Sequence, residues 1–170
     1  MITMAIVIII VSIAIPRMLS LQRYYVLQEL ERLTVTFKYL QQKALASNTQ
    51  QIITFDIHNN SYKFQGPGGK IQTYTLSNGI FFGTIKNILG PPAKPTHVIQ
   101  DVITFKKDQK EHDSPVFQAT FFPNGQISTG AAYLTDQDKQ TTGAFTCAVS
   151  QVSYIRVYIY ENNTWKVHTI

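Results

Sequence analysis

The sequence predicts an α+β protein, in which a long N-terminal helix packs on a β-rich head of about eight short antiparallel strands. Three features of the 170 residues predict this plan: an uncharged apolar run at the start, a helical spacing of apolar residues after it, and a two-residue alternation beyond residue 48. We therefore expect three parts: a transmembrane part of the helix at 1–16, an amphipathic part at 17–48, and a globular head at 49–170.

The apolar run extends from Met1 to Ile15, contains no charged residue and has Ile or Val at nine positions. On an insertion scale, these nine side chains favour the membrane by about 3 to 5 kcal/mol. At about 1.5 Å per residue the run covers roughly 22 Å of a hydrocarbon core of about 30 Å, so we expect further apolar residues upstream. The residues assigned to a helix buried in lipid or in a filament are Ile6, Ile9, Ile10, Ile13 and Pro16.

Two other interpretations of this run are weaker. A cleavable signal peptide needs a basic start and a small-x-small cleavage site, whereas no Lys or Arg precedes Arg17 and no such site follows the run. A buried core helix is disfavoured because so many Ile residues at the start of the chain have little to pack against. Pro16 removes the hydrogen bond to the carbonyl of Ser12, so we expect the helix to bend or loosen there without ending.

Beyond Pro16 the apolar residues recur at steps of three and four, which is the spacing of one helical stripe. Charged and amide side chains, Glu29 among them, fall mostly on the other faces. We expect the stripe to pack on the head and the helix to stop near Asn48; a coiled-coil partner is the alternative, with few heptads to support it. The stripe consists of Val26, Leu30, Leu33, Phe37, Leu40 and Ala44.

In the head, short runs of β-branched and aromatic residues alternate with Gly, Pro, Asn and Ser turns. Hairpins are expected around 58–61, 77–79 and 161–163. From these segments we expect about eight antiparallel strands, whose sheets need the apolar face of the helix as a cover. The segments are 51–57, 62–65, 71–76, 80–82, 98–106, 116–122, 131–134, 144–149, 155–160 and 164–169.

The charge distribution does not indicate a nucleic-acid-binding head. The chain has a net charge of +5, of which residues 1–50 carry +3, so the head carries only +2. The densest basic cluster, Lys106, Lys107 and Lys110, is interrupted by acidic residues and is interpreted as a solvated loop.

No residue pattern indicates catalysis, a cofactor or a metal. Asp136 and Asp138 could suggest calcium, but the Gly and the distal Glu of a calcium loop are missing. The four His residues are scattered, and no phosphate-binding, dinucleotide-binding or nucleophile motif occurs. Cys147 is the single cysteine and is interpreted as a small buried apolar residue. We therefore expect neither an enzyme nor a bound cofactor or metal.

In the order of these features, the chain resembles type IV pilins and pseudopilins, and in detail the minor pseudopilins of the GspH/FimT family. The resemblance extends over nearly the whole chain. Residues 1–8, with Pro16 after them, are similar to the family's membrane helix, and 41–48 before 52–55 are similar to its helix exit. Residues 122–130 are similar to its Phe-x-x-Gly-x-x-x-x-Gly turn, and 149–157 to its C-terminal strand.

The sequence departs from the family pattern at its start. The Gly-Phe cleavage site of prepilins and the acidic residue shortly after it are absent from the sequence. Either these residues lie upstream of Met1, which the shortness of the apolar run favours, or the chain is not processed.

The resemblance implies a minor pseudopilin, a structural subunit that helps initiate or cap a type II secretion pseudopilus or a related type IV pilus and so supports protein secretion. It implies a single-pass protein of the inner membrane, with the head in the periplasm or outside the cell. The implied partners are other pilins or pseudopilins, the inner-membrane assembly platform and, if the start lies upstream, prepilin peptidase.

Two alternatives stay open. Some relatives take part in DNA uptake through a Gly-Arg-x-Arg cluster on the C-terminal strand, and here only Arg156 matches it. The alternative function is therefore a minor pilin of the DNA-uptake type, with Arg156 as its DNA contact, whereas the leading interpretation expects no nucleic acid. The second alternative is a membrane-anchored β-domain that does not polymerise.

Overall fold

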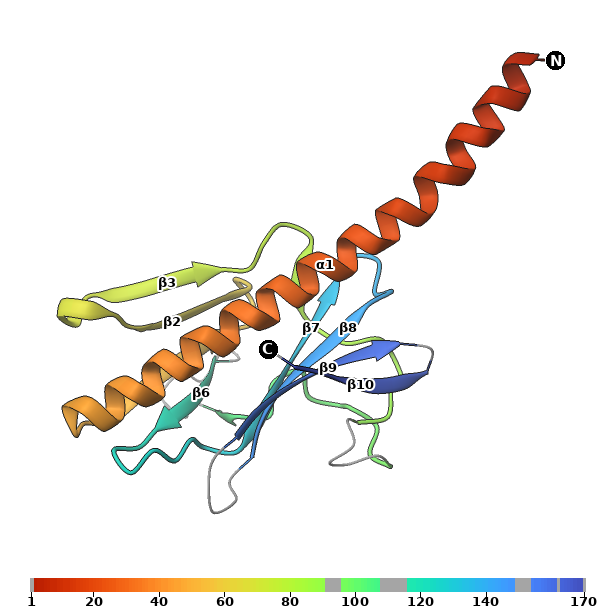
Figure 1. The fold of residues 1–170 in the computed structure, drawn as a ribbon. Helices are drawn as coiled ribbons and strands as arrows, with labels where there is room; N and C mark the ends of the chain where they lie inside the picture. Colours follow the sequence, from red (N-terminus) through yellow and green to blue (C-terminus); the bar gives the residue numbers. More distant parts are fainter. Residues whose placement is uncertain (1, 91–95, 108–115, 149–153, 162, 170) are drawn as a thin grey trace.

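The computed structural model describes residues 2–90, 96–107, 116–148, 154–161 and 163–169, and for residues 2–21, 107 and 148 it describes the backbone alone. The chain folds as one long N-terminal helix packed on a head of two antiparallel sheets (Figure 1). The predicted α+β plan is therefore confirmed.

The helix, α1 (Ile2–Ser47), continues through Pro16 without interruption. It ends at Asn48, whose φ of 51° is the left-handed conformation that closes many helices. Its second half lies across the head, while its first half projects beyond it (Figure 1). In the part of the chain that the structure describes, no helix is both long and apolar enough to cross a membrane. The side chains of the predicted transmembrane part, 1–16, lie outside the described residues.

Each sheet has five strands. Sheet A has the order β3-β2-β1-β6-β5, and sheet B the order β10-β9-β8-β7-β4. In sheet A the strands are β1 (Gln51–Asp56), β2 (Ser61–Gln65), β3 (Ile71–Thr75), β5 (Lys106–Lys107) and β6 (Val116–Phe121). In sheet B they are β4 (Ile80–Phe82), β7 (Gly130–Asp136), β8 (Thr142–Ala148), β9 (Tyr154–Glu161) and β10 (Thr164–His168). The described residues thus contain more strands than the eight or so that we expected.

Two local expectations about the strands are wrong. The segments around 77–79 were expected to form a hairpin, but β3 pairs with β2 and β4 pairs with β7, so the chain crosses from one sheet to the other there. The expected strand at 98–106 is mostly irregular: it forms single bridges at Val98 and Ile103 and joins a sheet only at β5. Alternation of apolar residues predicts an extended chain, but not which neighbour that chain finds.

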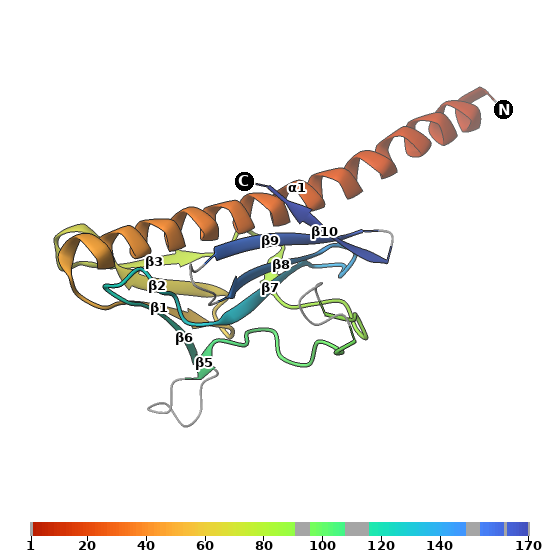
Figure 2. The same cartoon turned by 60° about the horizontal axis from the view of Figure 1, so that its bottom comes forward.

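The main core lies between the helix and both sheets. Phe37 of α1 is fully buried, and its ring centroid lies 4.5 Å from that of Phe145 in sheet B and 4.9 Å from that of Phe121 in sheet A. The rings of Phe55 and Phe105 complete the cluster, with centroids 6.2 and 5.9 Å from that of Phe37. One aromatic side chain of the helix therefore contacts both sheets. Figure 2 shows the helix lying along the two sheets.

Sheet B carries a second, smaller cluster on its other face. Side chains alternate along a strand, so Tyr158 points away from its neighbours Val157 and Ile159, which belong to the main core. The largely irregular residues 84–90 and 96–105 cover part of this outer face. Their backbone is tied to β7, since the amide of Tyr133 donates to the carbonyl of Val102 at 3.0 Å.

Candidate assembly interface

The buried stripe of α1 fastens the helix to the head. All six residues of the predicted stripe have exposed fractions of 1% or less: Val26, Leu30, Leu33, Phe37, Leu40 and Ala44. Residues with spacings of three and four lie along one side of a helix, so the stripe follows directly from the periodicity.

Close approach of the helix to β8 depends on Gly143. A Cβ atom added at Gly143 would lie 2.3 Å from Cδ1 of Leu30 and 3.1 Å from Cγ1 of Val26. No real side-chain atom fits at the first distance, so the helix can pack this closely only where β8 has no side chain.

A buried carboxylate adds a polar anchor to the stripe. Glu29 is 3% exposed, and its Oε1 accepts hydrogen bonds from the amide of Ser77, at 3.2 Å, and from the Ser77 hydroxyl. Nη1 of Arg32 lies 3.6 Å from the same oxygen, and its guanidinium lies over the ring of Tyr74 at 4.8 Å. Glu29 is an exception to the expected placement of the charged side chains on the other faces, because position 29 lies three residues after Val26 and four before Leu33, at the edge of the stripe.

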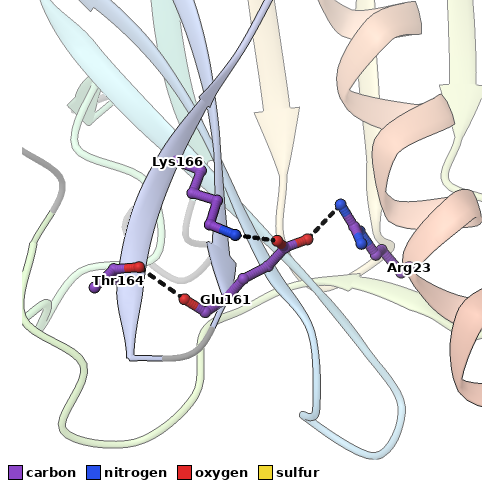
Figure 3. A network of polar contacts seen from close by, with 4 residues as sticks. All are labelled: Arg23, Glu161, Thr164 and Lys166. Atoms are coloured by element: carbon purple, nitrogen blue, oxygen red, sulfur yellow. Dashed lines mark hydrogen bonds and ion pairs between the residues drawn. The ribbon is translucent and has the colours of Figure 1, made fainter.

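The hairpin of β9 and β10 holds the helix where it leaves the head. Glu161 forms ion pairs with Arg23 of α1 and, at 3.1 Å, with Lys166 of β10 (Figure 3). The hydroxyl of Thr164 donates to the carbonyl of Glu161 at 2.9 Å and closes the turn. A further ion pair joins Glu31 to His168 at 3.4 Å. These contacts join the hairpin to the helix near the point where the helix leaves the head.

The exposed side of the helix carries apolar residues. Tyr24 and Val35 are 61% and 62% exposed, and eleven residues apart they lie on the same side, about three turns from each other. Leu45 is exposed as well. Single exposed apolar residues are ordinary. They support an assembly surface only together with the projecting half of the helix.

The turn at residues 122–130 has a geometry that needs its glycines. Gly125 has a φ of 82°, and its amide donates to the carbonyl of Phe122 at 2.9 Å. Gly130 lies at the start of β7, where an added Cβ would lie 2.2 Å from the ring of Phe105. Both glycines therefore have a physical reason in this chain: the first adopts a left-handed backbone, and the second admits a core ring.

Arg156 lies apart from the helix, on the outer face of sheet B. It is exposed, and its guanidinium lies 4.5 Å from the centroid of the Tyr154 ring. A cavity of about 550 Å³ opens beside it between the sheet and residues 97–104. Lys106 lies in β5 of the other sheet, whereas Lys110 of the predicted basic cluster lies outside the described residues.

The acidic turn considered for calcium serves the fold. Asp136 is buried, and its Oδ1 accepts from the amides of Gln140 and Thr141 at 2.7 and 3.1 Å. Oδ2 of Asp138 accepts from Nε2 of Gln22 at 3.0 Å. Over the residues that the structure covers, no three His, Cys, Asp or Glu side chains gather as metal ligands would. Cys147 is buried, and burial raises the pKa of its thiol well above the ordinary value, which disfavours the nucleophilic thiolate.

The arrangement can carry a head at a fixed angle on a projecting helix. The apolar stripe was predictable from the sequence. The contact of Glu29 with Ser77 and that of Arg23 with Glu161 were not, because each joins residues that lie far apart in the sequence. Comparison of the chain with protein-family models, with curated proteins and with solved structures gave no match.

Proposed function

We propose that this chain is a minor pseudopilin, a structural subunit that helps initiate or cap a type II secretion pseudopilus or a related type IV pilus. In this proposal residues 1–16 anchor it in the inner membrane, and the head lies in the periplasm or outside the cell. It acts by assembly with other pilins or pseudopilins and with the inner-membrane platform, and it catalyses no reaction.

One observation carries the proposal: a single continuous helix joins an uncharged Ile-rich run to the core of the head. The second half of α1 is fixed by the buried stripe and by the Arg23–Glu161 ion pair, while the first half extends beyond the head. An apolar helix presented in this way can be buried in lipid or against the helices of neighbouring subunits. In this proposal, subunits wait in the membrane, and the apolar helix moves from lipid to the helices of neighbouring subunits when the filament assembles.

Burial of the run is tested by the location of the protein in cells. The full chain made at native level is expected in the inner-membrane fraction, resistant to high-salt and alkaline extraction. Replacing Ile9 and Ile10 by Lys should release it, because each Lys costs about 3 kcal/mol at the centre of a membrane helix. A chain that is freely dissolved without these changes would contradict the proposed anchor.

Assembly is tested by genetics and by crosslinking. Deletion of the gene should impair secretion or pilus formation, and the full chain should restore it. A photo-crosslinking amino acid at Tyr24 or Val35, on the exposed side of the helix, should capture pilin-like neighbours, whereas one at Lys63 on the head should not. An intact filament system in the deletion strain would count against the proposal. Membrane anchoring without any such crosslink would favour the non-polymerising β-domain.

The DNA-uptake alternative has less support. Arg156 is the only Lys or Arg among the described residues that line the cavity, and Asp101 lines it too. Affinity for DNA rises with the number of phosphates that cations neutralise, so one Arg offset by one Asp is a poor DNA surface. Gel-shift titration of the full chain at low salt would revive this alternative if it showed a complex that Arg156→Gln abolishes.

A further inference from the structure

The cavity on the outer face of sheet B has a rigid floor. Paired strands β7, β8 and β9 form this floor, and its side chains include Ala131, Tyr133 and Tyr158, all buried. Thr104 ties the cover to the floor, because its Oγ1 accepts from the amide of Ala131 at 2.8 Å. A volume of about 550 Å³ lies within the range of pockets for small ligands, about 300 to 1,000 Å³.

Arg156 is held in place at this cavity. Its guanidinium lies over the ring of Tyr154 at 4.5 Å, and a hydrogen bond with Tyr158 raises its pKa above the ordinary value. The hydroxyl of Thr146 donates to the carbonyl of Arg156 at 3.4 Å. In the described part of the chain, no carboxylate forms an ion pair with Arg156. An Arg positioned in this way presents a planar fork that fits a carboxylate with two parallel hydrogen bonds.

The lining disfavours ligands that bind by stacking. Tyr133 and Tyr158 are 5% and 4% exposed, so their ring faces are covered by the protein. Tyr154 is more exposed, but the guanidinium of Arg156 already occupies a face of its ring. Nucleobases bind by stacking on open aromatic faces, and these three tyrosines offer few such faces.

The remaining groups indicate a carboxylate on a short aliphatic body. Val98, Ile99 and Ala131 supply an apolar wall, and Asp101 on the same cavity can accept a hydrogen bond from an N–H group. A peptide segment combines a carboxylate, an aliphatic side chain and an amide N–H within a few atoms. We propose that this cavity binds the carboxylate of a short aliphatic peptide segment, with Arg156 as its anion partner.

The test uses capped dipeptides and the full chain in a neutral detergent, observed by the backbone amide NMR signals of Thr146, Arg156 and Tyr158. N-acetyl-Val-Leu with a free carboxylate represents a chain end, and N-acetyl-Val-Glu-amide represents an acidic side chain. Each is compared with its neutral partner, N-acetyl-Val-Leu-amide or N-acetyl-Val-Gln-amide. At least one acid should bind with a Kd on the order of millimolar, and about tenfold more tightly than its neutral partner. The acid that binds identifies the source of the carboxylate.

Variants show whether Arg156 is responsible. Arg156→Gln should remove the tenfold preference for the acid, and Arg156→Lys should keep only part of it, because Lys lacks the planar fork. Asp101→Asn should strengthen binding of the acid two- to threefold by removing a like charge. Lys63→Gln, an equal charge loss on sheet A, should change nothing. Equal shifts by acid and neutral dipeptides, or an acid preference that survives Arg156→Gln, would overturn the proposal.

Discussion

The two faces of sheet B have different surroundings, although the same strands form both: one packs against α1 and the other lines a cavity. The face toward α1 is apolar and closed: Phe145 and Ile159 lie under the helix, and Gly143 lets the helix approach. The face away from α1, called the open face below, is only partly covered by irregular segments and has a cavity beside Arg156. Alternation along each strand separates the two sets of residues. Apart from Cys147, the residues that line the cavity are therefore separate from those of the main core under the helix.

The largest loss of stability is expected at Phe37, on the closed face, which is the face of sheet B toward α1. Phe37→Ala removes a ring that contacts four other Phe rings and leaves a cavity, so the free energy of unfolding should fall by about 3 to 5 kcal/mol. Chemical denaturation of the full chain in neutral detergent, followed by Trp165 fluorescence, measures this. Tyr154→Ala on the open face is the matched control and should cost less than about 1 kcal/mol. Similar losses for both would contradict the comparison.

A smaller effect is expected where the helix meets β8. Gly143→Ala places a methyl group 2.3 Å from Cδ1 of Leu30, which should cost about 1 to 3 kcal/mol of unfolding free energy. Leu30→Val removes that methyl group, so the loss caused by Gly143→Ala should be smaller in the Leu30→Val background. Denaturation of the two single variants and of the double variant gives this coupling directly. Additive losses would show that the close contact is not the cause.

The closed face was predictable from sequence because its cause is local. Periodicity placed Leu30 and Phe37 on one stripe, and alternation placed Phe145 on a strand. The burial of Glu29 was not predictable in this way, because a carboxylate at the edge of a stripe is buried only if a partner meets it, and its partner Ser77 lies 48 residues away. A local pattern indicates whether a residue favours burial or solvent. A polar contact such as that of Glu29 with Ser77 also depends on which distant segments the fold brings together.

The open face was less predictable for the same reason. Residues 98–106 alternate like a strand, yet Val98 bridges only Leu89 and Ile103 bridges only Ala132 of β7, and the segment joins sheet A at Lys106. The cavity is a product of that placement. Arg156 was noted from the sequence only through a family motif, and its setting beside Tyr154 and Tyr158 required the fold.

The burial of Tyr133 predicts a stability change at high pH that comes from the open face. Burial raises the pKa of Tyr133 above its ordinary value of about 10, so the folded protein keeps the phenol neutral when the unfolded chain has lost its proton. This stabilisation is fully present below pH 10 and is lost as the pH rises through the raised pKa. Tyr133→Phe should therefore flatten the decline of unfolding free energy above pH 10, measured by denaturation across a pH series. Tyr24→Phe, an exposed position, should leave the decline unchanged.

The smallest effect is expected at the ion pair that joins the β9–β10 hairpin to the helix. Arg23 is about half exposed, and exposed ion pairs contribute roughly 0.2 to 1 kcal/mol, so Arg23→Gln should lower the unfolding free energy by about 0.5 kcal/mol. Salt screens such a pair, so the difference should shrink at an ionic strength of about 1 M, where the Debye length is about 3 Å. Lys166→Gln removes the second cation of Glu161 and should behave alike, whereas Lys63→Gln should have no effect at either salt concentration. A loss that stayed the same in high salt would mean that Arg23 stabilises the head by packing of its aliphatic stem. In that case the direction of the projecting helix would depend on apolar contact, as the rest of the closed face does.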